Sequence, residues 1–304
     1  MGQIKLNKEL IMLSTKLKSN SYSYAKINLG LKVLDLLPDG YHSIFTIMQE
    51  INCYDTIKIS KTASQKISIK CDGPISVPET NNLCVEAAKL IFKEYNISGG
   101  VSILLTKHIP VGAGLGGGAS NAANVLLQLN NIFELNINSK RLEDLAFILG
   151  CDIPFFIRGG IQISEGKGEK LSPITIDLTR YFIVLVDPGF SVSTKWAYSS
   201  FKNSLNGFLK NDLTSTFNGN KFGSSQKGID WTLFENDFEK IINLTYPQVK
   251  KIRETLESKD SLFVSLSGSG STMFGIFDDF LKADLAKQAL KSYNSQIVKP
   301  IKRV

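Results

Sequence analysis

The sequence has little of what metal, redox and membrane proteins require. Its cysteines are Cys53, Cys71, Cys84 and Cys151. They lie far apart and form no C-x-x-C pair, so neither a zinc site nor a dithiol redox site is indicated. No segment approaches the ~18 to 20 consecutive apolar residues of a membrane span, and residues 1–20 lack the apolar core of a secretory signal. We therefore expect a cytoplasmic protein with reduced thiols and no membrane partner.

The sequence also lacks a concentrated basic region. Its 35 Lys and Arg residues outnumber 28 Asp and Glu residues, which gives a formal net charge of +7 and favours anionic partners in general. The lysines are scattered, however, and neither a long basic run nor RNP-type aromatic residues occur. We expect no nucleic-acid partner, and an RNA-binding module stays only as an alternative from a different class of function.

Length and composition indicate a globular chain with one large domain or about two. The 304 residues are 43% hydrophobic and 21% charged, so disorder is not expected. Residues 1–20 form a polar, weakly periodic appendage in which Met12 offers an alternative start. A polar insertion rich in Asn, Ser and Gly covers residues 202–230.

Hydrophobic periodicity predicts a mixture of strands and helices. Strands are expected within residues 22–34, 44–60, 66–71, 100–107, 181–188, on either side of 267–271, and 295–303. Helices are expected over residues 82–95, 122–133, 139–149, 234–243, 246–257 and 280–292, and 190–201 reads as a loop that passes into a helix. Because the elements do not alternate as regular βαβ units, the fold class expected is α+β.

The segment "IPVGAGLGGGASNAA", residues 109–123, places five glycines directly before a predicted helix. Glycine lets backbone N–H groups converge on an anion without interference from side chains. The free N–H groups and the positive dipole end of the helix add to this attraction. The segment therefore predicts a phosphate-binding loop.

Three well-known phosphate loops do not fit this segment. A P-loop needs Gly-Lys-Ser/Thr, whereas Gly118 is followed by Ala119 and Ser120. A dinucleotide fingerprint needs a tight strand-turn-helix and an acidic residue at the end of a second strand, whereas Pro110 interrupts the approach and only a helix follows. The His-Arg-Asp and Asp-Phe-Gly signatures of protein kinases are absent.

Polar residues elsewhere mark further candidate positions. Lys26 and Asn28 share one face of a predicted strand because side chains repeat every two residues. Tyr41 and His42 close a Pro-Asp-Gly turn. Asp152 follows the glycine that ends a predicted helix, and from sequence alone it also fits an Asx turn or a helix cap.

The loop pattern that remains, with Pro110, Gly114 and the residues up to Ser120, resembles the second motif of the GHMP small-molecule kinases. Five ordered segments extend the resemblance over residues 22–277: "YAKINLGLKVL" with "PDGYH", "IPVGAGLGGGASNAA", "LGCDIPFF", "DPGFSVST" and "LSGSGSTMFG". Together they resemble the 4-diphosphocytidyl-2-C-methyl-D-erythritol kinase family of that superfamily.

The resemblance implies a fold and an activity. The fold would be a two-domain GHMP kinase, with an N-terminal ATP-binding domain over 21–175 that is similar to the second domain of ribosomal protein S5. A ferredoxin-like C-terminal domain would cover 176–304, with the site between the two. The activity would be ATP- and Mg²⁺-dependent phosphorylation of the 2-hydroxyl of 4-diphosphocytidyl-2-C-methyl-D-erythritol in the non-mevalonate pathway. A monomer or a homodimer is expected.

The resemblance also assigns roles to residues around the substrate. Asp152 would accept the proton of the substrate hydroxyl, and Lys26 would lie beside it. Asn28 would bind the methylerythritol end. Tyr41 would stack on the cytosine and His42 would bond to it.

Further roles follow for the two loops. Tyr198 would support the cytosine from its other side, and Thr194 would line the site. The ATP-binding residues would be Lys107, Pro110, Val111, Gly112, Ala113, Gly114, Leu115, Gly116, Gly117, Gly118, Ala119 and Ser120. Ser120 would also cap the helix and help hold Mg²⁺. The turn that braces the loop and approaches the substrate diphosphate would comprise Ser267, Gly268, Ser269 and Gly270.

Other kinases of the superfamily, such as mevalonate or homoserine kinases, are the nearest enzymatic alternative. Their substrates contain no pyrimidine, so Tyr41 and His42 favour the cytidine-diphosphate substrate.

Overall fold

The computed structural model describes residues 21–204 and 229–303. The predicted appendage at 1–20 and most of the predicted insertion at 202–230 therefore lie outside the described residues. None of the helices in the described part of the chain is long and apolar enough to cross a bilayer.

The first half of the chain builds a six-stranded sheet. Its strands are β1 (Ser21–Leu36), β2 (His42–Thr62), β3 (Ile67–Asp72), β4 (Gly100–Thr106), β5 (Ile161–Gly166) and β6 (Lys170–Pro173). The hydrogen-bonded order is β3-β4-β2-β5-β6, and β1 pairs with β2 along most of its length. All pairs are antiparallel except β3 with β4, so the sheet is mixed.

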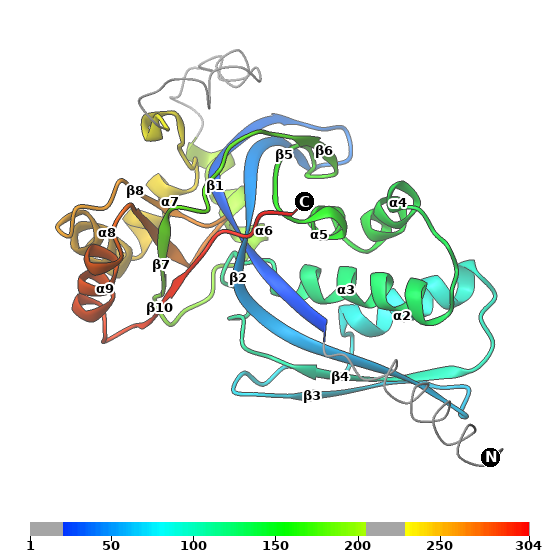
Figure 1. Cartoon of the computed structure of the whole chain (residues 1–304). Helices are drawn as coiled ribbons and strands as arrows, with labels where there is room; N and C mark the ends of the chain where they lie inside the picture. The colour runs from blue at the N-terminus through cyan, green and yellow to red at the C-terminus, as the bar shows by residue number, and fades with distance from the viewer. Residues whose placement is uncertain (1–20, 205–228, 304) are drawn as a thin grey trace, which may run out of the picture.

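Helices cover one face of this sheet (Figure 1). They are α2 (Leu83–Glu94), α3 (Gly117–Ile132), α4 (Ser139–Leu149) and α5 (Ile153–Arg158). Ile57 and Ile103 from the sheet share a buried cluster with Leu126 of α3 and Phe155 of α5. This apolar contact fixes the start of α3, where the glycine loop ends.

The second half builds a four-stranded antiparallel sheet in the order β10-β7-β9-β8. Its strands are β7 (Phe182–Asp187), β8 (Phe263–Leu266), β9 (Met273–Phe277) and β10 (Asn294–Val298). The associated helices are α6 (Thr194–Ser204), the short 3₁₀ helix η2 (Trp231–Leu233), α7 (Glu239–Thr245), α8 (Pro247–Glu257) and α9 (Phe280–Ala289).

A shared core joins the two sheets. Ile27 and Leu29 of β1 lie in one buried cluster with Ile183 and Leu185 of β7 and Phe274 of β9. The two halves are therefore packed together through β1, and the proposed boundary between residues 175 and 176 stays a prediction. The predicted α+β class is confirmed.

Several predicted elements differ in detail. The structure also contains α5, β5 and β6, which were not predicted from periodicity. The helix expected from residue 234 begins at Glu239, after η2. The strand expected over 295–303 ends at Val298, just ahead of Pro300, which has no N–H to donate.

Truncation of Ile27 tests the importance of the shared core. Ile27 has no exposed surface, so Ile27→Ala should lower the free energy of unfolding by about 2 to 5 kcal/mol. Leu244, which is 86% exposed, provides the control, because Leu244→Ala should change stability by less than about 0.5 kcal/mol. Urea denaturation of both variants measures the difference, and equal midpoints would contradict a core shared through β1.

Candidate active site

The glycine loop leads from the end of β4 into α3. Gly112, Gly114 and Gly116 have φ angles of 68°, 78° and 69°, which glycine adopts without strain. Gly116 is the N-cap of α3 and no side chain caps this helix. The first backbone N–H groups of α3 therefore have no side-chain acceptor, as an anion site requires. The prediction that Ser120 caps the helix is wrong, because Ser120 is a buried residue inside α3.

The loop is tightly packed against the turn between β8 and β9. A Cβ atom on Gly114 would lie 2.0 Å from the Ser267 carbonyl oxygen and 3.0 Å from that of Gly270. The Ser267 hydroxyl donates to the Gly114 carbonyl at 3.0 Å, and the Thr272 amide donates to that of Ala113 at 3.2 Å. The turn is thus in direct contact with the loop, as expected for a brace.

Lys26 joins the first strand to the loop. Its Nζ donates to the Gly114 carbonyl at 2.8 Å and to Asn28 Oδ1 at 2.5 Å. It also lies 4.0 Å from Asp152 Oδ2. Burial lowers the pKa of the Lys26 ammonium group from its ordinary value, and the Asp152 carboxylate partly opposes this effect. The amide of Asn28 is held in turn by the hydroxyl of Thr46 at 2.8 Å.

Asp152 occupies the N-cap position of α5 but does not act as a cap. Its side chain makes no capping hydrogen bond and is 47% exposed. The alternative that Asp152 serves only as a helix cap is therefore excluded. The carboxylate is instead partly exposed to solvent beside the Lys26 ammonium group.

The three aromatic residues predicted to bind cytosine are Tyr41, His42 and Tyr198. The His42 and Tyr198 rings are stacked, with centroids 5.8 Å apart and planes 20° apart. Tyr41 is 58% exposed, and the Lys167 ammonium group lies 5.1 Å from its ring centroid. Burial, followed by the charge of Asp152, raises the pKa of Tyr198. Tyr198, one of the predicted base-reading residues, therefore lies near Asp152, the predicted catalytic carboxylate.

The remaining predicted substrate residues lie on the facing loops. The Thr194 hydroxyl is 3.2 Å from that of Ser269, which connects the start of α6 to the turn at 267–270. A Cβ atom on Gly268 would lie 3.2 Å from Asn28 Oδ1 and 3.3 Å from Lys26 Nζ. The turn therefore reaches the Lys26 group as well as the glycine loop.

Lys107 lies beneath the loop rather than on its surface. It is 3% exposed, and its Nζ donates to Asp55 Oδ2 at 2.6 Å and to the Ile109 carbonyl at 2.9 Å. The structure does not bring this ammonium group to the face of the loop where a nucleotide is expected. Asp55 was missed from the sequence, where its only signal is an acidic residue at a position that alternation places on the same face as Ile51, Cys53, Ile57 and Ile59.

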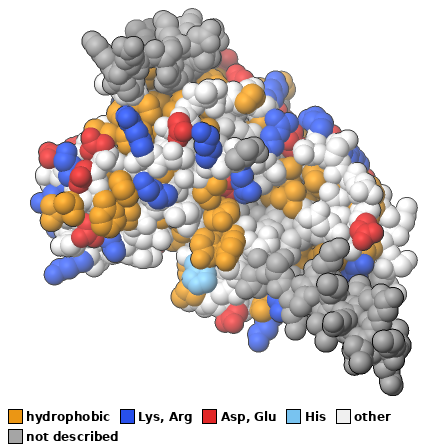
Figure 2. Space-filling model, viewed as in Figure 1, with side chains coloured by type: hydrophobic (Ala, Val, Ile, Leu, Met, Phe, Trp, Pro, Cys, Tyr) orange, Lys and Arg blue, Asp and Glu red, His pale blue; other side chains and the backbone are white. Residues whose placement is uncertain are grey.

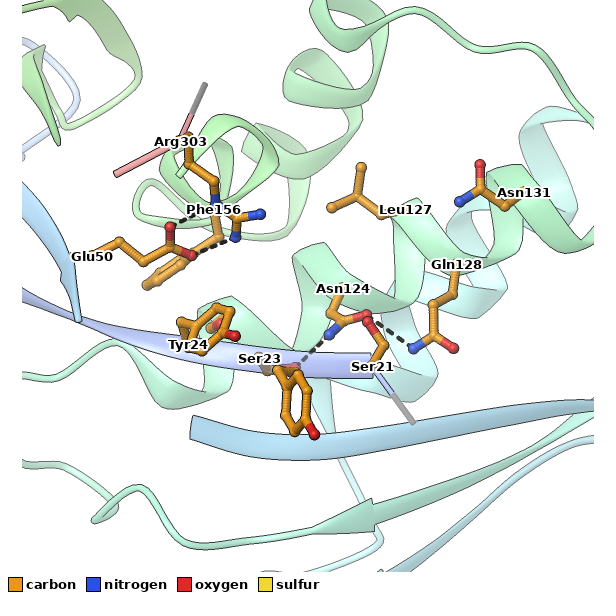
Figure 3. Close-up of a pocket in the computed structure, with 12 residues that line it drawn as sticks. Ser21, Ser23, Tyr24, Glu50, Asn124, Leu127, Gln128, Asn131, Phe156 and Arg303 are labelled. Carbon is orange, nitrogen blue, oxygen red and sulfur yellow. Dashed lines mark hydrogen bonds and ion pairs between the residues drawn. The ribbon is translucent and has the colours of Figure 1, made fainter. Parts of the chain in front are cut away.

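A cavity of about 140 Å³ lies between β1 and α3 (Figure 3). Its polar side chains are bonded to one another, since Asn124 donates to Ser23 at 2.9 Å and Gln128 donates to Asn124 at 2.9 Å. Glu50 and Arg303, which also line it, form a bidentate ion pair. Ser120, a predicted ATP-binding residue, also lines this cavity, so the cavity lies beside the first turns of α3.

The described residues carry mixed charges and show no cluster of metal-ligating side chains. On the face shown in Figure 2, Lys and Arg side chains are scattered among acidic and hydrophobic ones. The four cysteines are free thiols. Among the residues that the structure describes, no group of three or more His, Cys, Asp or Glu side chains could hold a metal ion.

Comparison with known proteins identifies the family of the chain. A model of the GHMP kinase N-terminal domain matches residues 82–160, and one of the GHMP kinase C-terminal domain matches residues 224–296. A 4-diphosphocytidyl-2-C-methyl-D-erythritol kinase of Pelodictyon phaeoclathratiforme is 39% identical over 270 residues, which cover 88% of this chain and 91% of the relative. The enzyme of the same name from Thermodesulfovibrio yellowstonii is 37% identical over 286 residues, 92% of this chain and 96% of the relative. The chain belongs to the 4-diphosphocytidyl-2-C-methyl-D-erythritol kinase family.

Solved structures agree with this assignment. A crystal structure of a 4-(cytidine 5'-diphospho)-2C-methyl-D-erythritol kinase matches with a TM-score of 0.74 and 29% identity, covering 93% of this chain and 99% of the other. A mevalonate kinase crystallised with R-mevalonate matches with a TM-score of 0.66 but only 16% identity, which shows a common fold alone. The family predicted from the five motifs is confirmed, and so is its two-domain GHMP kinase fold.

Substitution of two glycines tests the close contact at the loop. Gly114→Ala should lower the melting temperature by several degrees, because its Cβ would collide with the Ser267 carbonyl and its φ is positive. Gly118→Ala is the matched control, since its Cβ would meet only Leu83 at 3.7 Å and alanine is favoured over glycine within a helix by about 0.5 to 1 kcal/mol. Thermal unfolding compares the two, and equal melting temperatures would show that the contact can relax.

Proposed function

We propose that the protein transfers the γ-phosphoryl group of ATP to the 2-hydroxyl of 4-diphosphocytidyl-2-C-methyl-D-erythritol, giving the 2-phosphate and ADP. This places it in the non-mevalonate pathway to isoprenoid precursors. The observation that carries the proposal is the position of Asp152, which lies 4.0 Å from the Lys26 ammonium group while Lys26 itself bonds to the glycine loop. Membership of the family supports the choice of substrate.

The site supplies what phosphoryl transfer needs, which is mainly positioning and charge stabilisation. The uncapped start of α3 and the glycine backbone bind the phosphates of ATP. The Asp152 carboxylate takes the proton of the attacking hydroxyl as the oxygen reaches the γ-phosphorus. The Lys26 charge offsets negative charge that develops between donor and acceptor.

Binding of Mg²⁺ fits the oxygen-bearing groups near the loop, although no acidic cluster holds it within the described residues. Mg²⁺ commonly binds through substrate phosphates, water and one or two protein oxygens. The Ser120 hydroxyl, in the first turns of α3, is the protein oxygen that would hold it. When bound with ATP, Mg²⁺ neutralises charge on the phosphate oxygens.

Substrate recognition occurs at the opposite end of the same site. We assign Tyr41, His42 and Tyr198 to the cytosine, since an aromatic ring offers a stacking surface and an imidazole offers a hydrogen bond. Asn28 binds the methylerythritol hydroxyls beside Lys26. Thr194 and the turn at 267–270 approach the diphosphate. In this arrangement residues 21–175 contribute the ATP site and 176–304 close it.

Removal of the Asp152 carboxylate tests the proposal. Asp152→Ala should reduce kcat by about 10² to 10⁴, because no other carboxylate is assigned to accept the hydroxyl proton. The affinity for ATP should stay nearly unchanged, whereas the melting temperature should fall, because the buried Lys26 ammonium group loses the opposite charge 4.0 Å away. Single-turnover ADP release with the cytidine substrate measures the loss. Full turnover in the variant would remove Asp152 from the mechanism.

The depressed pKa of Lys26 predicts an alkaline limit to activity. As pH rises through its pKa in the folded protein, Lys26 loses its charge at a lower pH than an ordinary lysine, whose pKa is about 10.4. With rising pH, kcat/KM should therefore decrease at a pH below about 10.4. In Lys26→Arg, the activity that remains should not show this alkaline decrease. An alkaline limb at or above the ordinary lysine pKa in the parent enzyme would contradict the assignment.

The lowered pKa of Lys26 also makes the stability of the protein depend on pH. Between the pKa of Lys26 in the folded protein and its higher value in the unfolded chain, the unfolded state binds more protons. The contribution of Lys26 to stability therefore rises with pH in that window.

A further inference from the structure

Asp55 of β2 is a buried carboxylate that the proposed reaction does not use. It has no exposed surface. Its Oδ2 accepts hydrogen bonds from Lys107 Nζ at 2.6 Å and from Asn121 Nδ2 at 3.0 Å. Its Oδ1 accepts from the backbone amides of His108 at 2.7 Å and Ile109 at 2.8 Å. Four donors thus converge on one charged group, which makes the arrangement both strong and specific.

The four donors belong to the two ends of the glycine loop. Lys107, His108 and Ile109 form the segment that enters the loop after β4. Asn121 lies in the second turn of α3, where the chain leaves the loop. One carboxylate therefore holds the entry and the exit of the loop at a fixed separation.

The ion pair also lies directly beneath the anion-binding end of α3. A Cβ atom on Gly117 would be 2.8 Å from Lys107 Nζ and 2.9 Å from Ile109 Cγ2. Gly117 is the first residue of α3, whose free amides face the proposed phosphate site. Loss of the Asp55 charge would leave a buried ammonium group without its partner, and a group in that position is strongly destabilising.

We infer that Asp55 is a positioning residue for the phosphates of ATP. It acts through Lys107 and the backbone of His108 and Ile109, and it does not touch the nucleotide. The inference rests on the proposed function in one respect, namely that the glycine loop binds phosphate. It goes beyond that function by assigning the shape of the loop to a residue outside every motif of the family resemblance.

The first test is a comparison of Asp55→Asn with a matched control. Asparagine has nearly the shape of aspartate but lacks the charge, so the KM for ATP should rise at least tenfold while the KM for the cytidine substrate stays within twofold. Glu50→Gln is the control. Glu50 is 1% exposed on the same strand and accepts three hydrogen bonds, from Arg303 at 2.6 and 2.8 Å and from the Gly160 amide at 2.9 Å.

Because the partners of Glu50 lie outside the loop, Glu50→Gln should reduce stability without changing the KM for ATP. A purely structural role for Asp55 would make the two variants behave alike. Equal KM values for ATP in Asp55→Asn, Glu50→Gln and the parent enzyme would overturn the inference.

Hydrogen exchange provides a second readout that needs no ATP. In the ligand-free protein, amides of residues 110–120 should exchange at least tenfold faster in Asp55→Asn than in the parent, and Glu50→Gln should leave them unchanged. If the parent enzyme failed to bind ATP, the proposed function would fall while the exchange result still decided the role of Asp55. Unchanged exchange in Asp55→Asn would refute that role.

A double variant covers the case in which Asp55→Asn does not fold. Asp55→Asn combined with Lys107→Met leaves no unpaired charge in the interior. The same rise in exchange over residues 110–120 is expected for it, and exchange at the parent rate would count against the inference in the same way.

Discussion

The buried ammonium group of Lys26 is the contact on which the rest of the site depends. A charge in the interior is costly unless hydrogen bonds and an opposite charge compensate it. Here the compensation comes from three different parts of the chain: Asn28 on the same strand, the Gly114 carbonyl of the glycine loop and the Asp152 carboxylate at the start of α5. The contacts of Lys26 therefore bring together the proposed base, the proposed phosphate-binding loop and the strand that carries Asn28.

The second half of the chain packs closely against the glycine loop because Gly114 has no side chain. The carbonyl of Ser267 occupies the space that a Cβ would need, so the glycine loop and the turn at 267–270 determine each other's position. Since β1 also shares its apolar core with β7 and β9, the site and the fold rest on the same interface. A change in the relative position of the two halves would disturb both the proposed phosphate-binding loop and the proposed substrate contacts.

Local chemistry explains what could be predicted from the sequence. Glycine spacing before a helix predicted a phosphate-binding loop, and the two-residue period of a strand placed Lys26 and Asn28 on one face. The role of Asp152 came from the family resemblance, because an aspartate at a helix start is ordinarily a cap. Only the structure could show that its side chain caps nothing.

Tertiary contacts explain what could not be predicted. The stack of His42 on Tyr198 joins residues that are distant in sequence, and no local pattern encodes it. The burial of Lys107 depends on Asp55, which is 52 positions away. The helix α5 is too short to show a period, although it presents Asp152 to the site.

The most direct test is an ADP-release assay with Mg-ATP and three separate acceptors, namely 4-diphosphocytidyl-2-C-methyl-D-erythritol, mevalonate and homoserine. Turnover with the cytidine substrate alone is the predicted result. Turnover with mevalonate or homoserine, or with no acceptor, would contradict the assignment of Tyr41, His42 and Tyr198 to a pyrimidine and leave only the phosphate-binding loop in place.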